Sequence, residues 1–438
     1  MTDGNALPDI STPIPSAAGR AWIERLAASE CPALTTRRKR REERTGASHD
    51  PIVWTHAEGA NVVDVDGNRY VDLTSGFGVA FVGHRRPEVV DAVKRQTERL
   101  LHALGDLHPS DVKIELLERL CALSPWPKAR AMLSLSGADA VTSALKTAVL
   151  ATGKTGVIAF EGSYHGLTYG PLAVSGYAER FRAPFRSQLQ PDVSFAPWPC
   201  EHDDASSALA PLEELDWSSV GAVIVEPIQG RAGVRIPPPG FVAALGALCH
   251  EREAILIVDE IFTGVGRCGT WWRSVADGAE PDLICAGKAL GGGLPISACL
   301  GREEVMQAWG DPDREAIHTG TFYGDPLGAA AALATLALIE EHALLARAVE
   351  RGEFLGGALV AAKLHGVREV RQAGLMLGVQ LDGDARALGV TRALLERGYL
   401  VLPAGPRADV IQLAPSVTIT NAQVQGFIAA FAEAMGTR

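Results

Sequence analysis

The stretch that decides the fold begins with Ile255-Leu256-Ile257-Val258-Asp259-Glu260 and ends with Gly287-Lys288-Ala289-Leu290-Gly291-Gly292-Gly293-Leu294-Pro295. The run of apolar residues followed by an acid indicates a short buried strand that carries Asp259 at its carboxyl end. The glycines on both sides of Lys288 indicate a loop that can bend closely around a bound group. The stretch therefore predicts a carboxylate and an amine at one edge of a sheet.

A carboxylate paired with one lysine suits the chemistry of pyridoxal phosphate. This cofactor needs an amine that holds its aldehyde as a Schiff base, and an anion that keeps its pyridine nitrogen protonated so that the ring draws electrons. A nearby negative charge raises the pKa of that nitrogen, and a desolvated lysine can serve as both acid and base near neutral pH. We therefore expect Asp259 and Lys288 to be catalytic.

Four further segments support this hypothesis. Ser136-Gly137-Ala138-Asp139 is a strand-to-helix turn suited to a phosphate, and Tyr164-His165-Gly166 offers an aromatic ring that can stack on a planar cofactor. Glu226-Pro227-Ile228-Gln229-Gly230 ends a strand with a carboxylate, and His318–Pro326 offers hydroxyl groups in a tight loop. Each segment also has an ordinary explanation: an N-capped turn, a core or surface tyrosine, a solvated acid, and a chain reversal.

Strand and helix patterns alternate from about residue 60 to 320, which predicts an α/β fold with a mostly parallel sheet covered by helices. Ala60–Asp72 is expected to be a hairpin around Asp-Gly-Asn. Past Pro326 an alanine-rich helix begins a different pattern. We expect an N-terminal arm with part of a small domain at 1–60, a large domain at 61–326 and a small C-terminal domain at 327–438.

Composition narrows the class of protein. The chain has 438 residues, 47% of them hydrophobic, 46 glycines and a formal net charge of −11, which fits an α/β enzyme and gives no global attraction to nucleic acid or anionic membranes. No cysteine spacing suggests a disulfide or a metal site, so we expect reduced thiols, no metal and a cytoplasmic location. The seven cysteines are at 31, 121, 200, 249, 268, 285 and 299.

Two local features are expected to be unremarkable. Residues 1–18 are polar and Pro-rich and lack the basic start and apolar core of a signal peptide. The basic run Arg37-Arg38-Lys39-Arg40-Arg41, followed by Glu42-Glu43-Arg44, is interpreted as a solvated or interface helix end, because a nucleic-acid patch would have aromatic residues and a basic domain around it.

In order and spacing these segments resemble the class III (subgroup II) aminotransferases, a family of fold type I pyridoxal phosphate enzymes. The most specific blocks are DEIFTGVGRCG at 259–269 and GKALGGGLPISA at 287–298, and the similarity runs from GANVVDVDGNRYVDL at 59–73 to PSVTIT at 415–420. The resemblance implies a seven-stranded type of sheet sandwiched by helices, with a smaller α+β domain from both termini. It also implies a homodimer with shared active sites.

The resemblance assigns roles residue by residue. Lys288 matches the Schiff-base lysine and Asp259 the partner of the pyridine nitrogen, while Ile261 and Tyr164 match the residues on the two ring faces. The remaining cofactor residues that it implies are Ser136, Gly137 and Ala138 at the phosphate turn, Glu226 near the ring, and Thr321 on the neighbouring subunit's phosphate.

One departure bears on the substrate. Many members carry an arginine for the substrate α-carboxylate where this chain has Gln412, and an uncharged amide cannot make the same charge-assisted contact. Arg407 is a substitute candidate, with a solvent-exposed loop arginine as the alternative. Trp54, Phe77 and Phe81 are expected to form an apolar pocket wall, with core packing as the alternative.

These observations favour an aminotransferase that moves an amino group from a donor, with its amine distal to any carboxylate, to a keto acid or aldehyde in a ping-pong cycle. A pyridoxal phosphate aminomutase, amino-acid racemase or epimerase, or decarboxylase would need the same lysine and aspartate, so the motifs leave these alternatives open. A non-catalytic binding protein is disfavoured because both residues are present.

Overall fold

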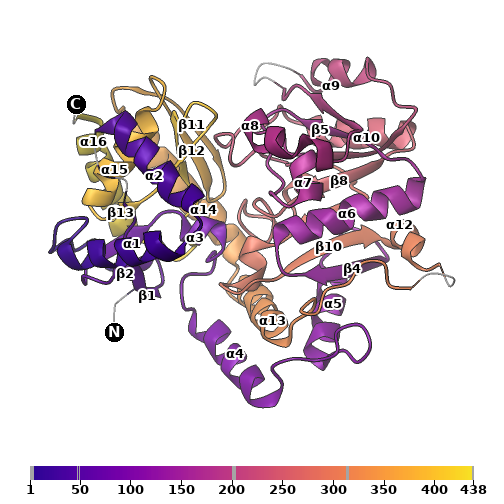
Figure 1. Ribbon diagram of the computed structural model, residues 1–438, viewed down its shortest axis with the longest axis horizontal. Coiled ribbons are helices and arrows are strands. Elements are labelled where there is room, and N and C mark those ends of the chain that lie inside the picture. Colours follow the sequence, from indigo (N-terminus) through magenta and orange to yellow (C-terminus); the bar gives the residue numbers. More distant parts are fainter. Residues whose placement is uncertain (1–3, 47, 49, 200–203, 312–314, 437–438) are drawn as a thin grey trace. The chain divides into compact units, whose positions relative to one another are not determined.

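The computed structural model describes residues 4–46, 48, 50–199, 204–311 and 315–436. The chain forms two compact units, shown in Figure 1. Unit 1 comprises Met1–Arg86 and Val349–Arg438, and unit 2 comprises Pro87–Ala348. Each unit has its own sheets and its own core.

Unit 2 is built on a seven-stranded sheet. Its strand order is β4 (Ala129–Ser134), β10 (Ser297–Arg302), β9 (Leu283–Ala286), β8 (Ile255–Asp259), β7 (Val220–Val225), β5 (Gly156–Phe160) and β6 (Val193–Ala196). Strand β10 runs antiparallel to both of its neighbours, and the pairs from β9 to β6 are parallel. The expected mostly parallel sheet is confirmed.

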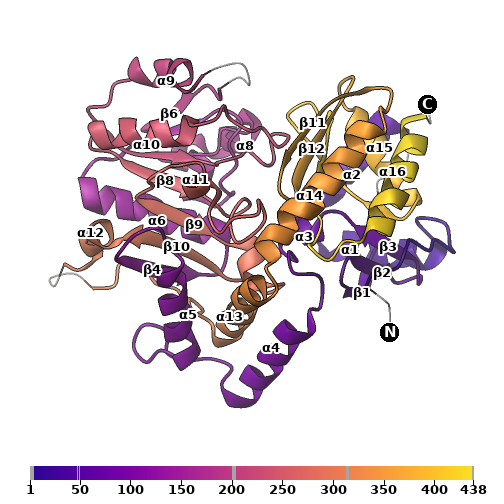
Figure 2. The ribbon, with the colours of Figure 1, turned by 180° about the vertical axis from the view of Figure 1, so that it is seen from behind.

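Helices cover both faces of this sheet, as Figures 1 and 2 show. Ala222 and Ile224 of β7 face a cluster that includes α6 (Gly137–Thr152), whereas Val223 and Val225 face a cluster that includes α9 (Ala205–Glu213) and α10 (Phe241–Glu251). Successive side chains of a strand point to opposite faces. A strand covered on both sides is therefore apolar throughout, as β7 is.

The alanine-rich helix α13 (Pro326–Glu341) belongs to unit 2, where it packs against α4 (Pro87–Arg99) and α5 (Asp111–Ala122). Its small side chains let it lie close to both neighbours. The other elements of the unit are short: α7 (Tyr169–Ala173), α8 (Glu179–Arg182), η1 (Ala183–Gln188), α11 (Arg273–Ala276), η2 (Lys288–Gly291), α12 (Glu303–Met306) and η3 (Gln307–Trp309).

Unit 1 contains two four-stranded sheets. One has the order β1 (Trp54–Glu58), β2 (Asn61–Asp64), β3 (Arg69–Asp72) and β13 (Tyr399–Leu400), and the other β11 (Val367–Ala373), β12 (Met376–Leu381), β15 (Val410–Leu413) and β14 (Leu402–Ala404). The expected hairpin is β2–β3. The helices are α1 (Ala17–Ser29), α2 (Pro32–Thr45), α3 (Ser75–Gly78), α15 (Arg386–Glu396), α16 (Asn421–Gly436) and most of α14 (Leu344–Ala361), whose first residues, through Ala348, belong to unit 2.

The compact units begin and end at different residues from the domains expected from the sequence. Strand β3 pairs with β13, so the hairpin at the expected start of the large domain joins unit 1. Helix α13, at the expected start of the small domain, joins unit 2. The expectation that independently folding domains meet at about residues 60 and 326 stays a prediction.

Two surface features bear on the earlier expectations. Among the described residues no single helix is both long and apolar enough to cross a membrane; α13 and α14 reach that length only together, across a break.

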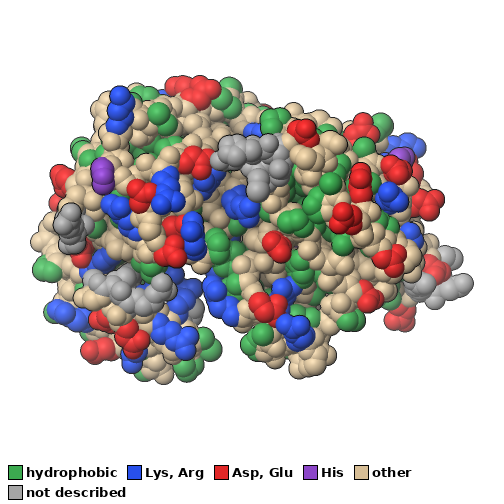
Figure 3. Space-filling view, turned by 90° about the horizontal axis from the view of Figure 1, so that it is seen from above, with side chains coloured by type: hydrophobic (Ala, Val, Ile, Leu, Met, Phe, Trp, Pro, Cys, Tyr) green, Lys and Arg blue, Asp and Glu red, His purple; other side chains and the backbone are tan. Residues whose placement is uncertain are grey.

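Acidic and basic side chains are interspersed on the face seen in Figure 3. The basic run lies on α2, with Arg37, Lys39 and Arg40 exposed, and the side chain of Arg44 lies outside the described residues.

Candidate active site

The residues expected to be functional in unit 2 follow the carboxyl ends of neighbouring strands. Asp259 ends β8, Glu226 follows β7, Lys288 follows β9, and Tyr164 lies in the turn after β5. In open α/β sheets, sites gather at this edge. We call Tyr164, His165, Glu226, Asp259 and Lys288 the strand-end cluster.

Asp259 is held in one orientation by two contacts. Its Oδ2 lies 2.7 Å from Nδ1 of His165, and its Oδ1 accepts a hydrogen bond of 3.1 Å from the backbone N–H of Ile261. The side chains of Asp259 and His165 are 5% and 0% exposed. Nε2 of His165 is buried and has no hydrogen-bond partner among the residues that the structure describes. A buried carboxylate held this firmly is suited to face a cationic group.

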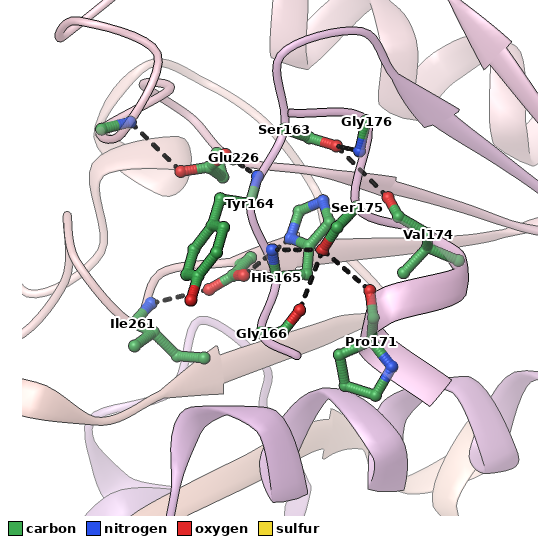
Figure 4. Close-up of polar contacts among 12 residues, drawn as sticks. Ser163, Tyr164, His165, Gly166, Pro171, Val174, Ser175, Gly176, Glu226 and Ile261 are labelled. Atoms are coloured by element: carbon green, nitrogen blue, oxygen red, sulfur yellow. Dashed lines mark hydrogen bonds and ion pairs between the residues drawn. The ribbon is translucent and has the colours of Figure 1, made fainter. Parts of the chain in front are cut away.

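Glu226 joins two backbone segments. Its Oε1 accepts a hydrogen bond of 2.9 Å from the N–H of Tyr164, and its Oε2 accepts one of 3.1 Å from the N–H of Gly230. Figure 4 shows Glu226 and Tyr164 together with His165, which lies next to Tyr164 in the chain. Burial is the main cause that raises the pKa of Glu226 to about 7, and the negative charge of Asp259 adds to the effect.

Lys288 has an unusual environment and an unusual backbone. Burial lowers the pKa of its amine, although Asp259 and Glu226 act in the opposite direction. Nζ lies 4.4 Å from the centroid of the Phe262 ring. The residue has φ +42°, a left-handed conformation that L-residues adopt at a cost of about 1–3 kcal/mol. Strain of this kind concentrates at functional sites, so it supports a role for Lys288.

The turn after β4 presents the N-terminus of α6. Ser136 and Asp139 form a capping box, in which Oγ of Ser136 accepts from the N–H of Asp139 and Asp139 Oδ2 accepts from the N–H of Ser136. The Ser136 hydroxyl is thus occupied by the cap, worth about 1 kcal/mol. The N–H groups of Gly137 and Ala138, in the first turn, have no intrahelical acceptor and are available to an anion.

Gly137 brings this helix end close to Ile261. A Cβ at position 137 would lie 2.7 Å from Cδ1 of Ile261, so a side chain there would require the Ile261 side chain to shift. The approach joins the helix end to the loop after Asp259.

These residues fit pyridoxal phosphate. The helix end can bind a phosphate, the desolvated amine of Lys288 can hold an aldehyde, and the fixed carboxylate of Asp259 can face a protonated ring nitrogen. Ile261 and Tyr164 are half-buried and offer an aliphatic and an aromatic surface.

The remaining predicted site residues lie elsewhere in the fold. Thr321 is on an exposed loop of unit 2 and shares a small hollow with Lys113 and Tyr323. The predicted substrate residues all belong to unit 1. Their roles stay predictions.

The environments of the substrate candidates differ. Trp54 and Phe77 are 43% and 69% exposed, whereas Phe81 is completely buried, which favours its core-packing alternative. Gln412 is a buried residue of β15. The Arg407 guanidinium is 2.8 Å from Oδ2 of Asp409, so it already has a carboxylate partner.

Three residues in or beside the strand-end cluster were not singled out from the sequence. His165 orients Asp259, Phe262 lies under the Lys288 amine, and Arg231 stacks on Tyr164, with its guanidinium carbon 4.4 Å from the ring centroid. His165 and Phe262 directly follow the predicted residues Tyr164 and Ile261 in the chain, and this adjacency is the feature of the sequence that could have indicated them. Nothing in the sequence around Arg231 indicated its contact.

The raised pKa of Glu226 leads to an expected pH dependence of stability. The folded state keeps a proton that the unfolded side chain loses near its ordinary pKa of 4.5, so the contribution of Glu226 is full below that pH and is lost as the pH rises through about 7. The shift corresponds to at most about 3 kcal/mol. Urea unfolding of the cofactor-free protein should show the advantage of wild type over Glu226→Gln shrinking from pH 5 to pH 8. An advantage that is independent of pH would contradict this assignment.

Comparison with known proteins identifies the family. The aminotransferase class-III family model matches residues 44–435. The acetylornithine aminotransferase of Methanopyrus kandleri is 38% identical over 388 residues, covering 89% of this chain and 95% of that protein.

Solved structures agree with this result. A thermostable (S)-enantioselective omega-transaminase from Thermomicrobium roseum has a TM-score of 0.86 and 27% identity, covering 96% of this chain and 98% of that one. A PLP-bound amine transaminase from an uncultivated Pseudomonas species has a TM-score of 0.82 and 27% identity, covering 88% and 95%. The strand-end cluster, the fold and these similarities agree, and the chain belongs to the class III aminotransferases, the pyridoxal phosphate-dependent family that its sequence resembles.

Proposed function

We propose that this aminotransferase uses Lys288 and Asp259 as its catalytic residues and takes the amino group from a donor whose amine is distal to its carboxylate. The observation that carries the catalytic assignment is the desolvated Lys288 amine, on a strained backbone, within the electrostatic influence of the buried Asp259 carboxylate. The acceptor is a keto acid or an aldehyde, and the two half-reactions alternate.

Pyridoxal phosphate, when bound, supplies an aldehyde that accepts the amino group and a ring that draws electrons from the donor carbon. Lys288 Nζ would hold the cofactor through its aldehyde, and the free amine would move the proton at the donor carbon. Asp259, oriented by His165 and by the N–H of Ile261, would supply the anion that keeps the ring nitrogen protonated. The N–H groups of Gly137 and Ala138, beside Ser136, would hold the phosphate.

The other residues around the cofactor have supporting roles. Ile261 and Tyr164 would hold the two faces of the ring, and Glu226 fixes the backbone of Tyr164 through their hydrogen bond. Trp54, Phe77 and Phe81 remain candidates for the apolar wall of the substrate pocket.

The preference for a distal amine rests on Gln412. A glutamine cannot give the bidentate, charge-assisted contact that an arginine gives to an α-carboxylate. Arg407 remains a candidate substitute, but it would have to leave Asp409 to bind a substrate. Relatives named omega-transaminase and amine transaminase support the same preference.

We also propose a cytoplasmic homodimer in which Thr321 binds the phosphate in the partner's site. The exposure of Thr321 supports this arrangement, because an exposed residue can be reached by a second subunit. Six cysteines are free among the described residues, which supports a reducing compartment. Cys200, which the same expectation covered, lies outside the described residues.

The test is a half-reaction without an acceptor. Stoichiometric cofactor-loaded enzyme mixed with an ω-amino acid should convert its bound pyridoxal phosphate to pyridoxamine phosphate, measured by chromatography after denaturation. The matched α-amino acid of equal chain length should react more slowly. If the cofactor stayed unchanged while the α-amino acid lost its optical purity, the enzyme would instead be a racemase.

A further inference from the structure

Arg231 has no carboxylate partner although it lies beside the strand-end cluster. Its guanidinium carbon is 4.4 Å from the ring centroid of Tyr164, 4.9 Å from that of Tyr177 and 5.6 Å from that of Phe181. Within the part of the chain that the structure describes, it forms neither an ion pair nor a side-chain hydrogen bond. Arg231 is therefore a half-buried cation that contacts aromatic rings, and no negatively charged group in the described part of the chain compensates its charge.

The local structure holds Arg231 at this place. Gln229 and Arg235 exchange two backbone hydrogen bonds of 3.1 Å and close the loop that carries Arg231. Glu226 accepts from the N–H of Gly230, the residue before Arg231, and from the N–H of Tyr164. One buried carboxylate therefore fixes both the loop of the guanidinium and the ring on which it stacks.

Stacking leaves the hydrogen-bonding capacity of the guanidinium unused. The guanidinium carbon lies over the Tyr164 ring, whereas the five N–H donors of an arginine form a planar fork that matches a carboxylate. The partial desolvation that the three rings provide strengthens a charge-assisted bond to an anion. Glu226, the acid that fixes this framework, uses its two oxygens on backbone N–H groups instead.

We infer that Arg231 is a specificity-determining residue that binds the carboxylate of the substrate. This inference rests on the proposed function and narrows it: the donors and acceptors that fit are amino acids and keto acids, in preference to simple amines, diamines and aldehydes. Arg231 belongs to unit 2 and is available to a carboxylate as it stands, whereas Arg407 of unit 1 would have to give up Asp409.

The test compares Arg231→Gln with wild type in the cofactor-loaded enzyme. Calorimetric titration with unreactive monocarboxylates, from propionate through hexanoate at constant ionic strength, measures binding apart from turnover. We expect the Kd of the tightest carboxylate to rise about tenfold, because a charge-assisted forked contact is lost. Arg231→Lys, which keeps the charge without the fork, should give a smaller rise.

Kinetics with two matched acceptors provide the second readout. The kcat/KM for pyruvate should fall about as much as carboxylate binding weakens, whereas that for propanal, which has the same chain length and no carboxylate, should stay within about twofold. Arg182→Gln is the matched control, because Arg182 stacks on Phe195 at 4.0 Å but already pairs with Glu179. It should behave as wild type.

The outcomes separate the possibilities. Equal carboxylate binding by Arg231→Gln and wild type would overturn the inference, and so would equal losses for pyruvate and propanal, which would indicate that Arg231 only supports the aromatic rings. If wild type binds carboxylates through Arg231 but converts no donor, the proposed function fails while the binding site stands. If wild type is active and Arg231→Gln is indistinguishable from it, only this inference fails.

Discussion

Lys288→Ala should lose turnover by at least about 10⁴-fold, because the variant lacks both the amine that holds the cofactor and the group that moves the proton. Burial lowers the pKa of the Lys288 amine, which favours the neutral form that attacks an aldehyde and accepts a proton. Initial rates with pyruvate as acceptor, and absorbance of the bound cofactor, measure the two losses separately.

Two comparisons test whether the missing amine causes the loss of turnover. Added ethylamine should restore a small part of the activity of Lys288→Ala, since the shortened side chain leaves room for a free amine. Lys128→Ala removes an exposed lysine that pairs with Glu303 and should leave turnover unchanged. Turnover near the wild-type rate in Lys288→Ala would refute the assignment.

Asp259→Asn should lower kcat on the order of 10²- to 10³-fold, the usual result when one preorganised electrostatic partner is removed. The amide is nearly isosteric but carries no charge, so the ring nitrogen would no longer be held protonated. Cofactor binding should weaken less than kcat falls. Steady-state rates at saturating cofactor distinguish the two effects.

A half-buried aspartate in the same sheet region, Asp282, provides the control for Asp259. Asp282 accepts a hydrogen bond of 2.8 Å from the backbone N–H of Leu256, at the opposite end of β8. Asp282→Asn should reduce stability with little effect on kcat. If Asp259→Asn stayed within a few-fold of the wild-type rate, or if both variants lost kcat equally, the electron-drawing role of Asp259 would be untenable.

The sequence predicted the fold class and the family, and both are confirmed. Strand patterns were informative where a strand is buried on both faces, as β7 and β8 are, since uninterrupted apolar runs stand out. Strand β10 was missed: it contains Ser297 and Gly301 and is the antiparallel strand of the sheet. Local patterns also could not assign the hairpin β2–β3 to unit 1, because its pairing with β13 spans most of the chain.

The site was predicted where local motifs carry the chemistry. Lys288, Asp259, Glu226 and Tyr164 stand at strand ends in recognisable segments, and the structure gathers them at one edge of the sheet. Arg231 escaped notice because its partners Tyr177 and Phe181 come from a distant segment, and an arginine–aromatic contact leaves no periodic signal. The structure also changes one detail of the phosphate turn predicted at Ser136–Asp139. The Ser136 hydroxyl is hydrogen-bonded to Asp139, which leaves the backbone N–H groups of this turn for a phosphate.

The most direct test of the central claim is to map the covalent attachment of the cofactor. Enzyme loaded with pyridoxal phosphate is reduced with borohydride, digested and analysed by mass spectrometry. The account predicts one phosphopyridoxyl group per chain, on the peptide that contains Lys288. A modified residue elsewhere, or an unmodified Lys288 in active enzyme, would contradict it.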